Sequence, residues 1–351
     1  MNAPGFAPIR FPHETPPGEG EATEIAQGVL WLRLPLPMAL DHVNVFALDD
    51  GEGWTIVDTG LSSRRIRALW DRLRSAGPLA DKPVIRVIVT HHHPDHVGLA
   101  GWFQAEHGAE VIASRTAWLY ARMLTLDMQQ TPPPETLAFY RAAGMDPAIY
   151  RQRAGGRPFN FADVVWPMPL GFTRIAEGGT VRIGGRLWDV RMGNGHAEEH
   201  ATLWSRDDSL VLGGDQLLPS ISPNLGVYAT EPGADPVGAW LESCTRLAGV
   251  AREDHLVLPG HKLPYTGLPA RLGQLIEHHH TALARLLDHL GEPRTAHECF
   301  PALYRRRIGD AEYGLALAES IGHLNHLHRT GRVDRQRRAD GAWLWRRADG
   351  G

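Results

Sequence analysis

The side chains best suited to metal chemistry lie in one short segment, residues 91–96, which reads His-His-His-Pro-Asp-His. The segment directly follows an apolar run that is typical of a buried β-strand. Imidazole nitrogens and carboxylate oxygens together suit a borderline ion such as zinc. In an extended loop, His91 and His93 point the same way, and Asp95 and His96 come from the next turn. The segment therefore predicts ligands for two adjacent ions.

Three further strand-like segments each end in one ligand-type residue beside a glycine or proline. The segments 186–192, 209–212 and 255–258 lead to His196, Asp215 and His261. In open α/β sheets ligands bind at the carboxyl ends of the strands, and glycine lets the backbone turn sharply there. The chain has nineteen histidines, so one cluster could arise as solvated surface, but four strand ends with a common geometry favour a shared site.

The four motifs HxHxDH, Gly-His, Gly-Asp and Pro-Gly-His, in this order, resemble those of the metallo-β-lactamase-fold hydrolase superfamily over roughly residues 25–265. The resemblance implies an α/β fold, a four-layer αββα sandwich with the site at one edge. It also implies three ligand sets: His91, His93 and His196 for one metal, Asp95, His96 and His261 for the second, and Asp215 as the bridge between them.

The resemblance implies a hydrolase with two divalent metal ions, which we expect to be zinc, although Mn²⁺ and Fe²⁺ accept the same ligands. A hydroxide bridging the metals would attack an ester, thioester or lactone of a small molecule. Asp95 would orient this hydroxide, and His200 would shuttle protons or bind the substrate. Tyr228 and Tyr265 are candidates for contacting the oxyanion, with a packing role as the alternative. Asp58 is a candidate for orienting a ligand histidine, with a turn-capping role equally open.

One motif departs from the family pattern. The family often has Gly-His-(Thr/Ser)-Pro-Gly-His, whereas this chain has Glu198 and Glu199 between His196 and His200. Glutamate is seldom buried without a partner, so we expect both carboxylates to point to solvent rather than toward the metals.

Composition sets limits on the class of protein. A chain of 351 residues predicts two domains, and 43% hydrophobic with 22% charged residues is ordinary for a globular protein. No run of eighteen apolar residues occurs, so we expect no membrane span. With only Cys244 and Cys299, a disulfide framework is excluded and the cytoplasm is the expected compartment. The net charge of −4 gives no general attraction for nucleic acid or an anionic membrane.

The chain divides into three predicted regions. Residues 1–24 are rich in proline and glycine and predict a disordered lead-in. Residues 25–265 form the predicted hydrolase domain, with an insertion at about 131–170 that is either a lid or a helical satellite. Residues 266–351 predict a long helix, shorter helices and a two-stranded ribbon. This order resembles a winged-helix domain, and the combination resembles the lactamase-β-2-type branch of the superfamily.

The C-terminal region leaves two roles open. Residues 302–349 carry ten arginines against six acidic residues, a local balance of +4 that could grip a phosphate backbone. The acidic net charge favours the other role, in dimerisation or lid support, so we expect a small-molecule substrate and a homodimer as partners. The alternative functions are a metal-dependent endoribonuclease or phosphodiesterase, and a non-enzymatic regulator that binds nucleic acid.

Overall fold

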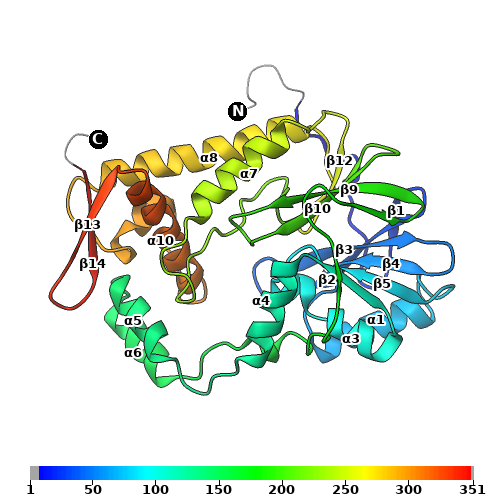
Figure 1. Ribbon diagram of the computed structural model, residues 1–351, viewed down its shortest axis with the longest axis horizontal. Helices are drawn as coiled ribbons and strands as arrows, with labels where there is room; N and C mark the ends of the chain where they lie inside the picture. Colours follow the sequence, from blue (N-terminus) through cyan, green and yellow to red (C-terminus); the bar gives the residue numbers. More distant parts are fainter. Residues whose placement is uncertain (1–7, 349–351) are drawn as a thin grey trace. The chain divides into compact units, whose positions relative to one another are not determined.

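The computed structural model describes residues 8–348, which fall into two compact units. Unit 1 comprises the described part of Met1–Met128 together with Phe159–Pro223 and Val250–Leu272. Unit 2 comprises Gln129–Pro158, Asn224–Gly249 and the described part of Gly273–Gly351. Figure 1 shows the strands of unit 1 and the helices and terminal ribbon of unit 2.

Unit 1 contains a seven-stranded sheet in which the strands follow one another in chain order. The strands are β1 (Thr23–Ala26), β2 (Val29–Pro35), β3 (His42–Asp49), β4 (Trp54–Val57), β5 (Val84–Ile88), β6 (Glu110–Ala113) and β7 (Thr173–Arg174). The first four pair antiparallel through short connections, whereas β4 to β7 pair parallel. Because β4 and β5 are parallel, their carboxyl ends lie at the same edge of the sheet.

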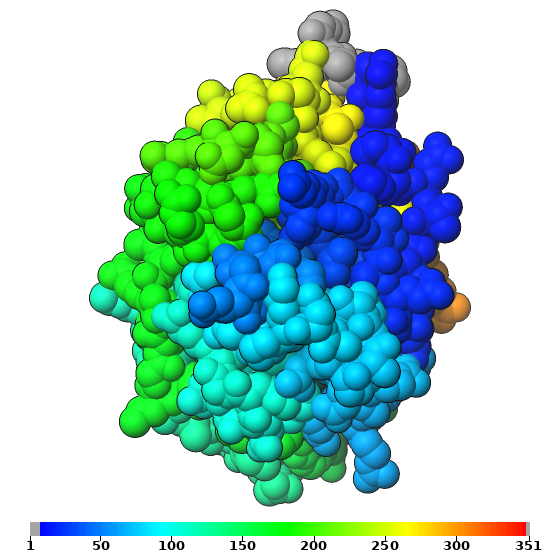
Figure 2. Space-filling view, turned by 90° about the vertical axis from the view of Figure 1, so that its right-hand side faces the viewer, coloured from blue at the N-terminus to red at the C-terminus, as the bar shows by residue number. Residues whose placement is uncertain are grey.

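A second sheet of five strands faces the first. Its strands are β8 (Thr180–Ile183), β9 (Arg186–Gly193), β10 (His200–Ser205), β11 (Leu210–Gly214) and β12 (Leu256–Pro259), in the order β12-β11-β10-β9-β8. Only β11 and β12 pair parallel. Figure 2 shows one face of unit 1, where the half with the first sheet (blue to cyan) lies against the half with the second (green).

The alternation of side chains explains why the sheets pack in this way. In β3, Val43 and Val45 belong to the core on the helix-covered face, while Phe46 and Leu48 belong to the core between the sheets. Because successive residues of a strand point to opposite faces, a strand with apolar side chains on both faces must be covered on both sides. Trp188 of the second sheet completes the core between the sheets.

Helices cover the outer face of the first sheet. They include α1 (Arg64–Ser75) and α3 (Ala100–His107). Unit 1 also contains the short helix α2 (Pro94–Val97) and the longer helix α4 (Arg115–Leu126). The hydroxyl of Ser63 accepts a hydrogen bond from the Ile66 N–H and caps α1, and Trp70 and Leu73 of this helix are buried. The serine cap and the apolar face together explain why this segment forms a helix that packs on the sheet.

The N-terminal segment differs in part from the prediction. The first seven residues of the predicted lead-in at 1–24 lie outside the described residues. In the described part, the backbones of Arg10 and Thr266 exchange two hydrogen bonds, of 3.3 and 2.9 Å, and β1 begins at Thr23. Backbone pairing with the loop after β12 thus orders residues that their composition alone assigns to a disordered tail.

Unit 2 is assembled from three separate stretches of the chain. Its elements are α5 (Pro134–Ala142), α6 (Pro147–Gly155), α7 (Pro236–Ala248), most of α8 (Leu268–His289), η2 (His297–Cys299), α9 (Phe300–Leu303), α10 (Tyr313–Arg329), β13 (Val333–Arg337) and β14 (Trp343–Arg347). The predicted insertion at 131–170 is divided, because its helices α5 and α6 join unit 2 and the residues from Phe159 join unit 1. The hydroxyl of Tyr313, in α10, accepts a hydrogen bond from the N–H of Asp146 at 2.8 Å. Because Asp146 directly precedes α6, this bond ties α6 to α10.

The helices give no sign of a membrane segment. Within residues 8–348, none combines the length and the apolar character that crossing a bilayer requires.

Gly98, which follows α2, allows a test of the packing beneath the loop at 91–96. A Cβ atom at Gly98 would come within 2.8 Å of the Ser62 nitrogen and closer still to the carbonyl oxygens of Gly60 and Pro94. All three obstacles are backbone atoms, which cannot move aside as a side chain could. We therefore expect Gly98→Ala to destabilise unit 1 by about 1–3 kcal/mol.

Thermal unfolding followed by circular dichroism measures this effect, with a fall in Tm of about 2–4 °C for each kcal/mol. Gly171→Ala is the matched control, because Gly171 lies in unit 1 and a Cβ added there would have no heavy atom within 4 Å. A Gly98→Ala variant that unfolds at the same temperature as the control contradicts the packing described here.

Candidate metal centre

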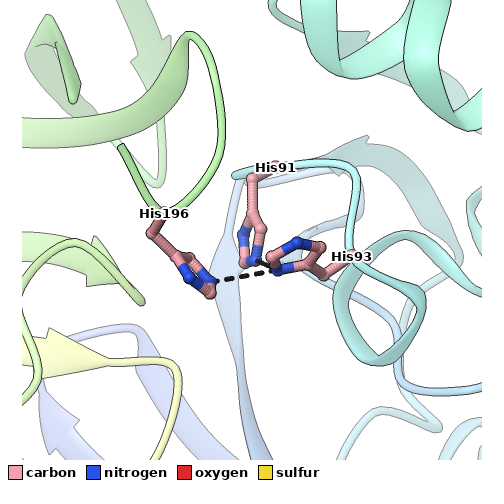
Figure 3. Close-up of side chains that lie close together, drawn as sticks. All are labelled: His91, His93 and His196. Atoms are coloured by element: carbon pink, nitrogen blue, oxygen red, sulfur yellow. Dashed lines mark hydrogen bonds between the residues drawn. The ribbon is translucent and has the colours of Figure 1, made fainter. Parts of the chain in front are cut away.

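Three histidine rings converge at the edge of unit 1 (Figure 3). His91 and His93 come from the loop after β5, and His196 comes from the loop after β9. The His91 Nε2 lies 3.1 Å from the His93 Nδ1, which in turn lies 3.0 Å from the His196 Nε2. Burial and the neighbouring histidines hold the pKa of His91 and His93 well below its usual value. Both rings are therefore neutral and offer nitrogen lone pairs to a metal.

A second group lies beside the first. Asp95 and His96 come from α2, and His261 follows β12. The Asp95 Oδ2 lies 3.3 Å from the His261 Nε2 and 3.6 Å from the His96 Nε2. One ligand atom from each of the three residues lies within 4.8 Å of the others, and the same holds for His91, His93 and His196.

Asp215, which directly follows β11, lies between the two groups. Its carboxylate oxygens are 3.4 Å from the His96 Nε2, 3.3 Å from the His261 Nε2 and 3.5 Å from the His196 Nε2. Burial alone would raise the pKa of Asp215, but the facing histidines His261 and His96 hold it well below its usual value. The carboxylate is therefore charged and within reach of both groups.

The residues of this centre fit divalent cations. Among the described residues, the His96 Nε2 and the Asp215 Oδ1 are buried and have no hydrogen-bond partner, although a buried polar atom normally has one. The carboxylates of Asp215, Asp95 and Asp58 raise the pKa of His96 well above its usual value, against the lowering effect of burial. A strongly negative potential and unpartnered ligand atoms at one point are what a bound cation would satisfy.

Asp58 orients His96. Its Oδ2 lies 2.7 Å from the His96 Nδ1 and accepts the Thr90 hydroxyl at 2.8 Å, while its Oδ1 accepts the Thr90 N–H. A hydrogen bond from Nδ1–H leaves the Nε2 of His96 free to bind a metal. Asp58 adopts φ 62°, a conformation that costs energy for a residue other than glycine and that is concentrated at functional sites. These contacts favour the orienting role over a simple turn cap.

Asn44 is a residue that the sequence analysis missed. From the middle of β3, its side-chain nitrogen donates to the carbonyl oxygens of Pro259 and Lys262, and its own N–H donates to the Gly260 carbonyl. The side chain thus fixes the loop that carries His261, whose Nδ1 donates to the His42 carbonyl at 2.7 Å. An asparagine inside an otherwise apolar strand was the available signal, since a buried amide needs partners.

His200 lies behind the ligands. It is fully buried, its ring stacks on His91 with centroids 4.5 Å apart, and its Nε2 accepts the backbone N–H of Asp215 at 3.0 Å. Burial, together with His196, lowers the pKa of His200 to about 3. Because the Nε2 is occupied as an acceptor, the proton of the neutral ring is on the Nδ1, which is buried without a hydrogen-bond partner, so this geometry does not favour the expected proton shuttle.

Glu199 and the candidate tyrosines, Tyr265 and Tyr228, lie in surroundings that differ from those expected of solvent-facing or substrate-contacting side chains. Glu199 does not point freely to solvent: its carboxylate accepts the Thr116 N–H at 2.8 Å, at the N-terminus of α4, where a helix favours negative charge. Tyr265 is fully buried in unit 1 and its hydroxyl donates to the Leu217 carbonyl, so it has a packing role. Tyr228 belongs to unit 2, where it is 50% exposed.

An aromatic run extends outward from the metal loop within unit 1. The ring of His92 lies 4.8 Å from His93, 5.0 Å from Tyr120 of α4 and 6.4 Å from Phe161, measured between centroids. Phe161 in turn lies 6.2 Å from Phe159, which is 68% exposed. An exposed aromatic ring connected in this way to a polar centre offers an apolar surface to a ligand.

Comparison with known proteins agrees with this geometry. Residues 38–261 match the family model described as metallo-beta-lactamase superfamily, and residues 283–348 match one described as metallo-beta-lactamase-like, C-terminal domain. The chain is 27% identical to "Probable metallo-hydrolase YqjP" of Bacillus subtilis (strain 168) over 315 residues, which are 86% of this chain and 92% of that protein.

Two solved structures extend the similarity to the fold. A beta-lactamase domain protein from Burkholderia ambifaria has a TM-score of 0.88 and 35% identity, covering 97% of this chain and 98% of that one. A metallo-beta-lactamase family protein from Thermus thermophilus has a TM-score of 0.76 and 26% identity, covering 92% and 100%. These similarities confirm the predicted fold class, an α/β sandwich followed by a helical C-terminal region, and the chain belongs to the metallo-beta-lactamase superfamily.

Proposed function

We propose that this metal-dependent hydrolase cleaves an ester, thioester or lactone of a small molecule with an apolar part, using two zinc ions. The observation that carries the proposal is the position of Asp215, within 3.5 Å of a nitrogen of three histidines from both ligand groups. One ion would be held by His91, His93 and His196, the other by Asp95, His96 and His261, and both by Asp215. Neutral imidazoles with carboxylates favour zinc, although Mn²⁺ and Fe²⁺ accept the same donors.

Two divalent ions bound by these residues would supply a water acidified toward neutral pH and an electrophile for the carbonyl oxygen. Asp95 is the more accessible carboxylate, since its side chain is 19% exposed against 8% for Asp215. We assign Asp95 to orienting the attacking water, whose proton it can accept. His200 holds Asp215 through its backbone N–H, so we assign it a positioning role.

The aromatic run supports an apolar substrate. His92, Tyr120, Phe161 and Phe159 lead from the metal loop to the surface of unit 1, so the acyl or aryl part of a substrate bound at the centre has a surface to lie on. No charged side chain takes part in this series of ring contacts, which favours a neutral small molecule over a phosphodiester.

The nuclease alternative has one observation in its favour. The ribbon β13–β14 exposes Arg335, Arg337, Arg346 and Arg347, and such a surface suits a phosphate backbone. We also propose a cytoplasmic location, because Cys244 and Cys299 are free and buried, as is usual for a reducing compartment.

Removal of the metals tests the hydrolase proposal directly. We expect the metal-loaded protein to hydrolyse aryl or acyl esters, thioesters or lactones, and a strong chelator to abolish turnover until Zn²⁺ is restored. Asp215→Asn should lower both metal content and turnover at least about 100-fold, because this carboxylate faces both ligand groups. Elemental analysis and a substrate panel measure the two effects together.

The control is Asp189→Asn, which removes a carboxylate of unit 1 that pairs with Arg206 instead of a ligand histidine. Turnover that survives complete removal of metal would overturn the proposal. Cleavage of RNA with a rate that falls steeply as salt rises, without ester turnover, would instead favour the nuclease alternative.

A second prediction concerns Asp58. Replacing Asp58 with Asn leaves a neutral amide beside the His96 Nδ1, so the ring loses the charged acceptor that orients it. Loss of such a partner typically weakens metal affinity about 10–100-fold. Competition with a chelator of known affinity measures this change.

Asp49→Asn serves as the comparison, because Asp49 bonds to Lys82 at the end of β3 and contacts no ligand histidine. If Asp58→Asn and Asp49→Asn bind zinc equally well, Asp58 does not orient His96.

A third prediction tests the aromatic run. Phe159→Ser removes an exposed ring, so we expect kcat/KM to fall about 3- to 10-fold for long-chain or aryl esters and to stay unchanged for acetate esters. The matched control is Leu170→Ser, which removes an apolar side chain that is 82% exposed and takes no part in the run. An equal loss for long and short esters would show that the run does not select the substrate.

A further inference from the structure

We infer that unit 2 carries a second ligand site, a cavity of about 480 Å³ that binds a monocarboxylate with an apolar tail. The cavity is lined by residues of α5, α10, the ribbon β13–β14 and the segment 229–233, all of which belong to unit 2. Figure 1 labels these helices and the two strands of the ribbon. It shares no residue with the metal centre, and we refer to it as the ribbon cavity.

Two arginines of β13 provide the positive end of the ribbon cavity. The guanidinium carbon of Arg335 lies 4.4 Å from the ring centroid of Trp343 and 5.1 Å from that of Trp345. The guanidinium carbon of Arg337 lies 4.2 Å from the same Trp343 ring, and its Nη1 donates to the Gly341 carbonyl at 2.6 Å. Stacking on indole fixes both planar groups and leaves their N–H edges available for a ligand.

These two charges are not neutralised by the protein. Within residues 8–348, neither Arg335 nor Arg337 forms an ion pair, and Glu135, the acidic residue in the lining, contacts neither of them through a salt bridge. Burial, and then the charge of Arg337, lower the pKa of Arg335. A carboxylate placed between the two guanidinium groups would relieve this repulsion and accept two parallel hydrogen bonds.

The remaining lining includes Glu135, Asn325 and the rings of Trp343 and Trp345, and its other side chains are small or apolar. Besides Phe139, Pro232 and Ile321, it contains five alanines, at positions 138, 142, 143, 229 and 296. A volume of about 480 Å³ falls within the range of small-molecule sites, which are mostly apolar with a few polar groups that fix orientation. Alanine walls leave room for an alkyl chain or a flat ring, and they offer no series of polar groups to follow a nucleic-acid backbone.

Two other arginines of this region differ from Arg335 and Arg337, because carboxylates already neutralise them. Arg306 pairs with Glu312, and Arg338 pairs with Asp340 at 2.8 Å. Arg335 and Arg337 thus combine what the paired arginines lack: free charge, fixed orientation and an adjoining apolar cavity. A ligand with one anionic head and an apolar tail satisfies all three features.

Calorimetric titration of the full-length, metal-loaded protein tests the inference with three probes: octanoate, acetate as the head alone and 1-octanol as the tail alone. We expect octanoate to bind at least tenfold more tightly than either fragment, because only octanoate engages both ends of the ribbon cavity. The double variant R335Q/R337Q should lose at least tenfold in octanoate affinity.

The control R346Q/R347Q removes the same charge from the adjacent strand β14, at two exposed arginines outside the cavity lining, and should bind octanoate as the native protein does. Ala142→Trp fills the cavity while keeping both arginines, so it should also lose octanoate affinity, whatever the double variant does to the ribbon. Hydrolysis of a neutral ester should continue in all three variants.

Several results would overturn the inference. They are no binding of octanoate by the native protein, equal affinity for octanoate and 1-octanol, or an equal loss in R335Q/R337Q and R346Q/R347Q. Octanoate binding that persists in both R335Q/R337Q and Ala142→Trp would place the acid elsewhere, such as at the metal centre. That outcome leaves the proposed hydrolase unaffected, so the two proposals fail separately.

Discussion

The structure of unit 1 depends on burying carboxylates and histidines at one edge of its sheets. Taking a charged carboxylate out of water is costly unless opposite charge is close at hand. Asp215, which is 6% exposed, meets this cost through its ion pairs with His96, His196 and His261, and its Oδ1 remains without a hydrogen-bond partner. The fold therefore holds a concentration of negative potential that divalent cations are suited to balance, and the apolar layers below keep water from relieving it.

The backbone is strained at several residues that hold the buried carboxylates and histidines of the metal centre in place. Among residues 8–348, three residues other than glycine have positive φ: Asp58, Glu199 and Lys262. Asp58 bonds to His96, Glu199 lies in the loop that carries His196, and Lys262 directly follows His261. Gly260 contributes in another way, since a Cβ there would meet the Asp215 carboxylate and the His96 ring. Strained and crowded backbone is thus concentrated where the sheets deliver ligands, as expected for a site that the rest of the fold stabilises.

The sequence predicted what local patterns determine. The seven ligand-type residues follow apolar strands, so their convergence could be inferred from the strand ends. Long-range partners carry no such pattern. The contacts of Asn44 with Pro259 and Lys262 cross more than two hundred residues, and the capping of α4 by Glu199 joins residues 83 apart in the chain. The predicted region 266–351 supplies most of unit 2, but the two other stretches that join it, Gln129–Pro158 and Asn224–Gly249, were missed for the same reason.

Unbalanced charge identifies a ligand more sharply than total charge does. The ten arginines of residues 302–349 suggest a surface for nucleic acid when they are counted together. Their environments differ, however: Arg306 and Arg338 are paired with carboxylates, whereas Arg335 and Arg337 are stacked on Trp343 without such partners. A phosphate backbone needs free charges spaced along an open path, and here the free, oriented charges adjoin a cavity walled by alanines. The same reasoning assigns cations to the metal centre, where the uncompensated charge is negative, and an anion to the ribbon cavity, where it is positive.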